Sequence, residues 1–416
     1  ERQNFLHFYY FFITHKQKER ACNMNTQRKP INKTGLKITL LIISLSQLGS
    51  MAISSVISEI LEAFPDVPDQ TVQFLMTFPG LFILITSLLS AFLARYISQK
   101  KLAVTGLILN TATAVGGLLF HGNIFILFCW AATLGLGIGM WMPLVNAIAS
   151  AHFEGNERAS LLGRVSSAQN IGAVFMTVAG GALAVMAWHF VYLVYFIAVP
   201  GLICAVIYLP DEKAHSESRR SGGLGIDGAV ILFSVIQFFF SLPYNAGPAN
   251  FSLLLTENGI GSSQAAGTLS GLFLFGGIIS GWFFGTLDKR IHKFTIPLGF
   301  LFLAAGFTGL GCTHSFAAYA LFSVVGGMSI PLVLPQSSLG VVENKKPGQF
   351  AMASAVLLAF GNLGAFFSPV TTSFSSVIMG SDSIASRMIF CAALSVIGAA
   401  VTAVILKIRK ENEDDV

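Results

Sequence analysis

Twelve long apolar segments constrain how this chain can fold. A helix needs about 20 consecutive, mostly apolar residues to cross a lipid bilayer, and each segment approaches or exceeds that length. The strands of a membrane barrel would alternate apolar and polar residues, which these segments do not do. The predicted spans are 36–61, 71–93, 102–120, 124–148, 160–186, 190–209, 227–255, 264–286, 295–313, 316–340, 350–378 and 384–408. Only 11% of the 416 residues are charged, against about 25% in soluble domains. The sequence therefore predicts an all-α integral membrane protein with twelve transmembrane helices.

Basic residues separate cleanly between the two sides of this predicted membrane. Loops on the same side as residue 24 hold twenty Lys and Arg residues, and the opposite loops hold one, Arg387. Positively charged loops stay in the cytoplasm. We therefore expect a multi-pass protein of the plasma membrane with both termini in the cytoplasm. The net charge of +5 comes from these short loops, so we expect the lipid bilayer, and no nucleic acid, as its macromolecular environment.

A short motif occurs twice in the chain. The segment 139–145, GMWMPLV, returns at 327–333 as GMSIPLV, with five of seven residues identical at an offset of 188. A second echo, 170–175 and 362–367, follows at an offset of 192. Two echoes in the same order indicate one duplicated unit of six spans. The predicted parts are an N-terminal six-helix bundle, 24–209; a cytoplasmic linker, 210–226, rich in charge, Ser and Gly; a C-terminal six-helix bundle, 227–408; and a cytoplasmic tail, 409–416.

Residues 1–23 are treated separately. The chain does not begin with Met, and its first aromatic run, 5–13, is too short to span a bilayer. We expect this segment to be a non-native or disordered extension.

With these features the chain after residue 24 resembles the major facilitator superfamily, whose members have two six-helix halves and a substrate site near the midplane between them. The family's basic loop after span 2 is partly altered here, because Arg95 replaces its Asp and only Lys100 remains at its end. The counterpart after span 8 keeps Asp288, Lys289 and Lys293. In the family this loop latches the outward-facing state, so the resemblance implies a conformational role for Lys100, Asp288 and Lys293.

Span 5 is similar to the drug/proton antiporter branch of that family. Its glycine pattern is matched by Gly163, Gly172, Gly180 and Gly181, while Met176 and Thr177 replace Gly-Pro. Glycines on one helix let a neighbouring helix approach closely, so we expect these four in packing and conformational change. The branch's usual arginine in span 4 is absent, with Ala131 near its place.

In the family, spans 1, 4, 7 and 10 line the central cavity. Polar residues on these spans are the candidates for substrate contact, since polar groups facing lipid are costly. They are Gln47, Trp141, Asn146, Gln237, Tyr244, Asn245 and Gln336. The alternative is that amides join neighbouring helices, which we favour for the repeated Asn170 and Asn362. Ser50, Ser54 and Ser58 share a stripe with Gln47, and hydrogen bonding to their own backbone is their alternative role.

No charged residue lies in the middle of any predicted span. A buried carboxylate is the usual proton carrier in such transporters. Glu62, one turn beyond Ser58, is the candidate for proton coupling, and a solvated charge at a helix end is the alternative. A cavity without Lys or Arg also argues against anionic substrates.

Two functions follow from the resemblance. The first is an efflux carrier, an antiporter-like monomer that moves small neutral or amphipathic solutes by alternating access. The second is a permease for a polar neutral nutrient or metabolite. An aromatic-walled pocket would favour the first, and convergent amides would favour the second. An enzyme would need clustered His, Asp, Glu or Cys at one depth, which the sequence lacks; we expect no metal, no cofactor, and protons as the candidate coupling ion.

Overall fold

The structure is a computed structural model that describes residues 32–94, 96–153, 155–212, 226–342 and 350–414. Helices make up the regular structure of these residues. The N-terminal half contains α2 (Lys33–Ser44), η1 (Gly49–Ser55), α3 (Ile57–Ala63), α4 (Asp69–Leu93), α5 (Gln99–Leu119), α6 (Ile124–His152), α7 (Gly155–Ala184), η2 (Trp188–Ile197) and α8 (Ala198–Tyr208). The C-terminal half contains α9 (Gly228–Glu257), α10 (Ser263–Ile291), η4 (His292–Phe294), α11 (Thr295–Cys312), α12 (Phe316–Gly327), α13 (Ile330–Val342), α14 (Phe350–Met379) and α15 (Ile384–Asp414).

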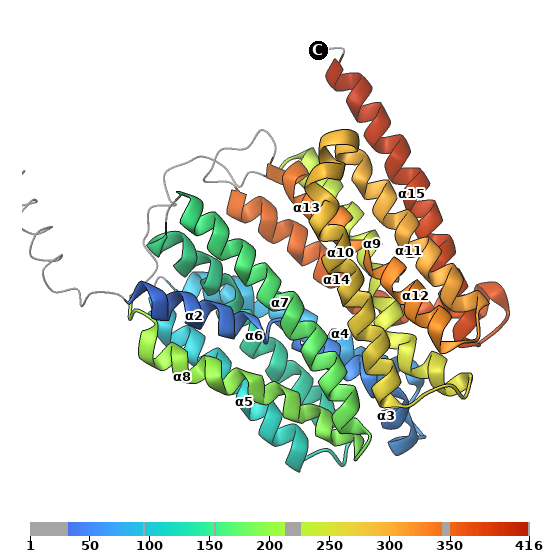
Figure 1. Ribbon diagram of the computed structural model, residues 1–416, viewed down its shortest axis with the longest axis horizontal. Coiled ribbons are helices and arrows are strands. Elements are labelled where there is room, and N and C mark those ends of the chain that lie inside the picture. Colours follow the sequence, from blue (N-terminus) through green and yellow to red (C-terminus); the bar gives the residue numbers. More distant parts are fainter. Residues whose placement is uncertain (1–31, 95, 154, 213–225, 343–349, 415–416) are drawn as a thin grey trace, which may run out of the picture.

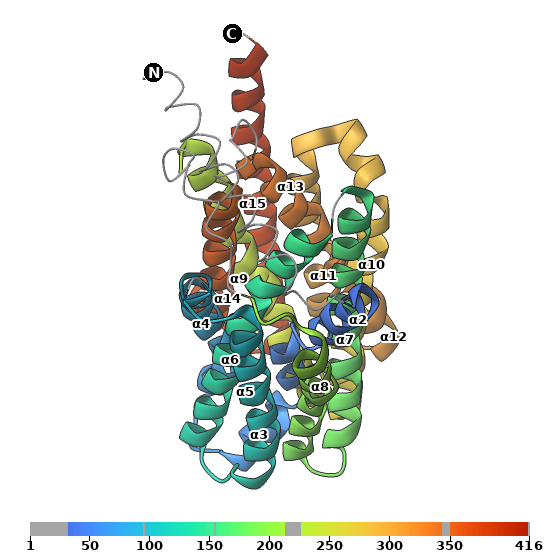
Figure 2. The same cartoon turned by 90° about the vertical axis from the view of Figure 1, so that its left-hand side faces the viewer.

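The helices form two bundles that lie side by side (Figures 1 and 2). In the N-terminal bundle α6 packs on α4 and α5, and in the C-terminal bundle α9 packs on α14 and α11 on α15. Two helix pairs, α7 with α10 and α4 with α14, join one bundle to the other. The two bundles approach each other near α3 and diverge away from it (Figure 1).

Eleven segments of the described chain are long and apolar enough to cross a membrane. The predicted span 160–186 is a helix, α7, but it falls outside this set because its first turns are polar. Its exposed side carries Ser160, Arg164 and Ser167 and then, further along, Ile171 and Phe175. The polar turns lie beyond the apolar part of the helix, so α7 is longer than the segment that can sit in hydrocarbon. The fold is the predicted twelve-helix membrane architecture.

Three predicted spans are divided between two or more helical elements, among them the sixth, which is η2 followed by α8. The first span is α2 followed by the 3₁₀ segment η1 and then α3, with its break at residues 45–48. The tenth is α12 followed by α13, and there Ser329 Oγ donates to Gly326 O at 2.6 Å. The stripe predicted along the first span assumed 3.6 residues per turn throughout, whereas a 3₁₀ segment has three. Ser54 and Ser58 of that stripe nevertheless both contact the other bundle.

Glycines of the duplicated motif occupy equivalent places in the two bundles. A Cβ on Gly139 would lie 2.8 Å from Ile83 O on α4, and one on Gly327 would lie 1.6 Å from Phe273 O on α10. The second echo repeats this agreement, with Gly172 against Leu45 O of the first span and Gly364 against Phe238 O of α9. Both copies therefore use glycine at the same helix crossings, which supports duplication.

Candidate functional site

The two bundles are joined by hydrogen bonds near α3. Three pairs of uncharged side chains cross from one bundle to the other here: Ser54 Oγ and Ser270 Oγ (2.9 Å), Ser58 Oγ and Ser252 Oγ (2.5 Å), and Gln73 Nε2 donating to Asn250 Oδ1 (3.0 Å). We call these six residues the α3 seal. All six are buried, so water does not compete for their hydrogen bonds. The seal closes the space between the bundles at this end.

Two helix seams flank the α3 seal, and they differ in chemistry. In the α7–α10 seam a Cβ on Gly181 would lie 2.4 Å from Ser263 O, and one on Gly267 would lie 2.4 Å from Thr177 O. The backbones there are in direct contact. In the α4–α14 seam aromatic rings meet, with the centroid of Phe366 5.4 Å from that of Phe74 and 6.5 Å from that of Phe78.

Two polar contacts of the described residues at the opposite end, near the start of α2, lie within the N-terminal bundle. Lys37 Nζ lies 2.6 Å from Glu157 Oε1, and His152 Nε2 lies 3.7 Å from Glu212 Oε2. The hydrogen bond from Lys37 holds the pKa of the Glu157 carboxyl below its usual value. Neither contact joins the two bundles, whose ribbons diverge toward this end (Figure 1). In the described chain the bundles therefore contact each other at the α3 end and diverge toward the α2 end.

The loop residues that the family resemblance selected lie at this second end. Lys100 and Asp288 are both half-buried, and neither has an ion pair in the described structure. Arg95 and the side chain of Lys293 lie outside the described residues. The conformational role expected for Lys100 and Asp288 therefore stays a prediction.

The N-terminal bundle separates its three predicted cavity residues. Gln47 is half-buried beside the break in the first span, and Gln169 Nε2 donates to its Oε1 at 2.7 Å. Asn146 is exposed on α6. Trp141 is fully buried and, with the Asn110 amide oriented to satisfy both groups, donates to it at 3.2 Å. This placement favours helix packing between α5 and α6 over substrate contact for Trp141.

The predicted residues of the C-terminal bundle are all buried. The ring centroid of Tyr244 lies 5.5 Å from that of Phe240 and 5.0 Å from that of Phe273, inside the bundle. Asn245 Nδ2 donates to Ser241 O, one turn back on its own helix, at 2.9 Å. The two interactions pack Tyr244 and tie down one end of the Asn245 amide.

Gln237 and Gln336 have unused hydrogen-bonding capacity. They are 3% and 5% exposed, and neither Oε1 has a partner in the protein. Gly340 packs on Phe233, so the next turn of α13, with Gln336, lies beside the next turn of α9, with Gln237. Hydroxyls on α9, α13 and α14 also have no partner in the protein: Ser234, Ser337 and Ser368. Buried polar atoms are normally paired, so these side chains keep hydrogen-bonding capacity that the described protein atoms do not use.

Glu62, the predicted proton-coupling residue, is exposed at the end of α3. Glu59, one turn earlier, is half-buried and reaches the α3 seal. Ser58 Oγ donates to Glu59 Oε2 at 2.9 Å, and Ser252 Oγ of the other bundle lies 3.5 Å from the same oxygen. Glu59 is therefore a carboxylate whose surroundings would change if the bundles moved apart at this end.

Three of the four glycines of the span 5 pattern stand at close contacts. Gly172 packs on Leu45 O, Gly180 lies 3.1 Å (Cβ position) from Val191, and Gly181 packs on α10. Gly163 faces open space. Asn170, expected to join helices, instead donates to Ser166 O of its own helix at 3.0 Å.

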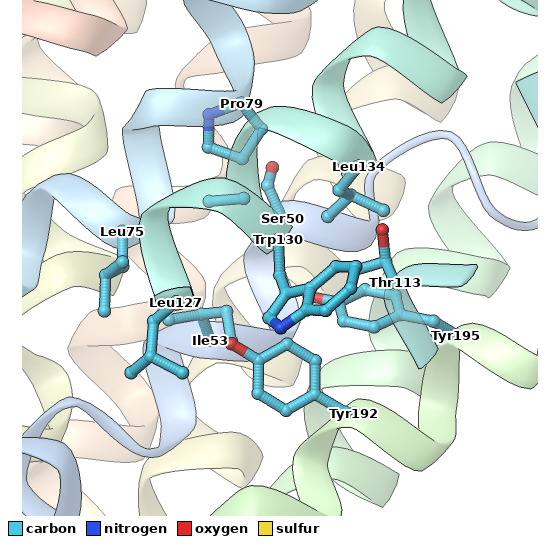
Figure 3. Close-up of a pocket in the computed structure, with 11 residues that line it drawn as sticks. Ser50, Ile53, Leu75, Pro79, Thr113, Leu127, Trp130, Leu134, Tyr192 and Tyr195 are labelled. Atoms are coloured by element: carbon cyan, nitrogen blue, oxygen red, sulfur yellow. The ribbon is translucent and has the colours of Figure 1, made fainter. Parts of the chain in front are cut away.

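A small cavity lies inside the N-terminal bundle (Figure 3). Its volume is about 10 Å³, room for about one water. Ser50, Trp130, Ala131, Tyr192 and Tyr195 are among the side chains that line it. It is too small for a transported solute. In the described part of the chain, no group of three or more His, Cys, Asp and Glu side chains could hold a metal ion.

Several residues of the α3 seal were not anticipated from the sequence. Gln73, Ser252 and Ser270 lie on predicted spans, but their partners are far away in the sequence, 177 to 216 residues apart. The sequence marks each of them only as a polar residue in an apolar span. Such residues are too common along the chain for this feature to identify contacts between the bundles.

Comparison with known proteins agrees with this geometry. The family model described as Major Facilitator Superfamily matches residues 39–243. A crystal structure of a mutant of the nucleoside transporter NupG superposes with a TM-score of 0.75 at 12% identity, covering 89% of this chain and 99% of that one. A bacterial homolog of the human lysosomal transporter Spinster, in an inward-facing and occupied conformation, gives 0.73 at 16% identity over 91% and 98%. A POT peptide transporter in complex with alafosfalin gives 0.70 at 13% identity over 89% and 94%.

The chain thus shares the fold of these membrane transporters. Over residues 39–243 its sequence is similar to the Major Facilitator Superfamily.

Proposed function

We propose that this chain is a secondary active transporter that moves a small neutral solute across the plasma membrane by alternating access. The observation that carries the proposal is the α3 seal, a set of polar contacts between bundles at one end, with the bundles apart at the other. If the termini are cytoplasmic, as the basic loops predict, this conformation is inward-facing. Rocking of the bundles would break the seal and open the opposite side.

The buried polar side chains of the described residues favour a neutral, hydrogen-bonding solute. Among the buried polar side chains of the described residues, Arg387 alone is charged, and it lies at the α3 end. The amides of Gln47 and Gln169 pair on one bundle, and the amide oxygens of Gln237 and Gln336, which have no partner in the protein, lie in the other. Amides on both bundles favour the permease hypothesis. Nucleoside and peptide transporters share the fold, which makes such solutes reasonable first probes.

Efflux of amphipathic compounds is the second candidate. The aromatic seam of Phe74, Phe78 and Phe366 and the close contacts of the span 5 glycines favour it. Aromatic side chains suit apolar ligands.

Counterflow in proteoliposomes would test both candidates. Liposomes with the purified chain would be loaded with an unlabelled solute and diluted into the same solute at tracer concentration. We expect accumulation for a neutral polar class, represented by nucleosides and dipeptides, and none for a lipophilic dye. Accumulation of the dye alone would favour the efflux candidate. Accumulation of none, with a chain that still changes conformation, would contradict the proposed substrate class.

Proton coupling would be tested with two matched carboxylate variants. We expect Glu59→Gln to remove the dependence of uptake on an imposed pH gradient, because Glu59 contacts both bundles. Glu62→Gln removes an exposed carboxylate one turn away and should retain that dependence. Loss in Glu62→Gln with retention in Glu59→Gln would restore the prediction made from sequence.

A further inference from the structure

We propose that Arg387 holds the α3 end closed through an ion pair with Asp69, and that it keeps an ion pair with Asp382 when that end opens. We call Arg387 with these two carboxylates the latch. This inference rests on the proposed alternating-access function, but it concerns the conformational equilibrium and not the solute.

Arg387 connects the bundles directly. It lies on the first turn of α15 in the C-terminal bundle, with its side chain 7% exposed. Its Nη1 donates to Asp69 Oδ2, at the start of α4 in the N-terminal bundle. Asp69 Oδ1 also accepts from the backbone N–H of Gln70 at 2.8 Å, which orients the carboxylate.

A second carboxylate approaches the same guanidinium from its own bundle. Asp382 Oδ1 lies 3.6 Å from Arg387 Nη2, in the loop that precedes α15. The Asp382 side chain is 83% exposed, whereas that of Asp69 is 29% exposed. Asp69 is therefore the inner partner across the bundles, and Asp382 is the outer partner within one bundle.

This arrangement lowers the cost of opening. Separating a buried ion pair is costly mainly because one charge is left without a partner. When the bundles part, Asp69 leaves with α4, but Asp382 stays with Arg387 because both belong to the C-terminal bundle. The guanidinium keeps a carboxylate in both conformations, so the pair with Asp69 can hold the closed state without preventing its release.

The latch predicts opposite effects for the two carboxylates. Asp69→Asn removes the partner that Arg387 has in the closed state, so the equilibrium should shift toward the open α3 end. Asp382→Asn removes the partner that Arg387 keeps in the open state, so the equilibrium should shift toward the closed α3 end. An ion-pair network with a purely structural role would be weakened in the same sense by either change.

Electron–electron distance measurements on the full chain would test this. Spin labels would be placed at Ala63→Cys and Ser262→Cys, both exposed at the α3 end on different bundles, after replacement of the five native cysteines. We expect Asp69→Asn to raise the ratio of long to short distances by about fivefold, and Asp382→Asn to lower it, as for a partly exposed ion pair. No solute is required, so a wrong substrate class would not affect the result.

Asp66→Asn is the matched control, because Asp66 is an exposed carboxylate three residues before Asp69 with no ion pair in the described structure. It should leave the distances unchanged. A shift in the same direction for Asp69→Asn and Asp382→Asn would overturn the latch, as would an unchanged distribution in Asp382→Asn. If Asp69→Asn fails to fold, Asp382→Asn decides alone, since its exposed side chain can be changed without loss of packing.

Discussion

At the scale of single residues, glycines of one sequence pattern have different surroundings. Gly172 lies against the break in the first span, where a Cβ would be 1.9 Å from Leu45 O. Gly163, nine residues earlier on the same helix, has no neighbour within 4 Å of a Cβ position. The same residue type therefore serves close packing at one position and has no such role at the other.

This difference predicts opposite stability changes for two identical substitutions. Gly172→Ala should destabilise the protein by roughly 1–3 kcal/mol, because the backbone of the first span must move. Gly163→Ala should stabilise it by up to about 1 kcal/mol through helix propensity. Thermal unfolding in detergent measures both. Equal melting temperatures for the two variants would contradict the contact between Gly172 and Leu45.

The amide oxygen of Gln237, which has no partner in the protein, gives the second prediction. Gln237→Met keeps the shape of the side chain and removes a buried polar group, so thermal stability should hold or rise. If the amide binds solute, the Michaelis constant of transport should increase by roughly tenfold, the loss of about one hydrogen bond. Transport kinetics and melting temperature are read on the same preparation. An unchanged Michaelis constant would assign Gln237 to packing alone.

At the scale of helices, the two seams between the bundles differ in how closely they fit. The α7–α10 seam brings backbones together through Gly181 and Gly267, whereas the α4–α14 seam is filled by Phe side chains. Rings can change rotamer, but backbones in contact cannot absorb an added side chain. Closure of the α3 end should therefore depend more strongly on small residues in the first seam.

Gly267→Val tests this dependence. A Cβ at this position would lie 2.4 Å from Thr177 O, so the seam should not close and the α3 end should open. A cysteine at Ser270, buried in the α3 seal, should then react faster with a membrane-impermeant maleimide. Gly285→Val, on the same helix with open space at its Cβ position, is the control. Equal reactivity in both variants would reject the seam as the closing contact.

At the scale of the whole molecule, two bundles built from one duplicated unit hold each other at one end. The repeated glycines place span 4 on span 2, and span 10 on span 8, by the same kind of contact. Contacts between bundles are not duplicated, because serines and amides meet near α3 while the Lys37–Glu157 pair near α2 stays within its own bundle. The packing within the two bundles is similar, whereas the contacts between the bundles differ from one end of the molecule to the other.

The orientation of the molecule in the membrane, that is, which end faces the cytoplasm, can be measured. We expect Asp66→Cys, exposed in the loop after α3, to be labelled by an impermeant reagent in intact cells. Asp211→Cys, exposed after α8, should be labelled only after permeabilisation, because the basic loops share its side. Labelling of Asp211→Cys in intact cells would reverse the orientation and make the described conformation outward-facing.

The sequence by itself determined the apolar membrane helices and predicted the duplicated unit. These properties follow from features local to the chain: the length of an apolar run, and glycine at a helix crossing. The tertiary structure decided which polar side chains meet. Ser58 and Ser252 are 194 residues apart, and their contact depends on the rotation of each helix about its axis, which apolar content does not specify. The same dependence on helix rotation buries Trp141 between α5 and α6. It also places Arg387, the one basic residue predicted on its side of the membrane, between two carboxylates where the bundles meet.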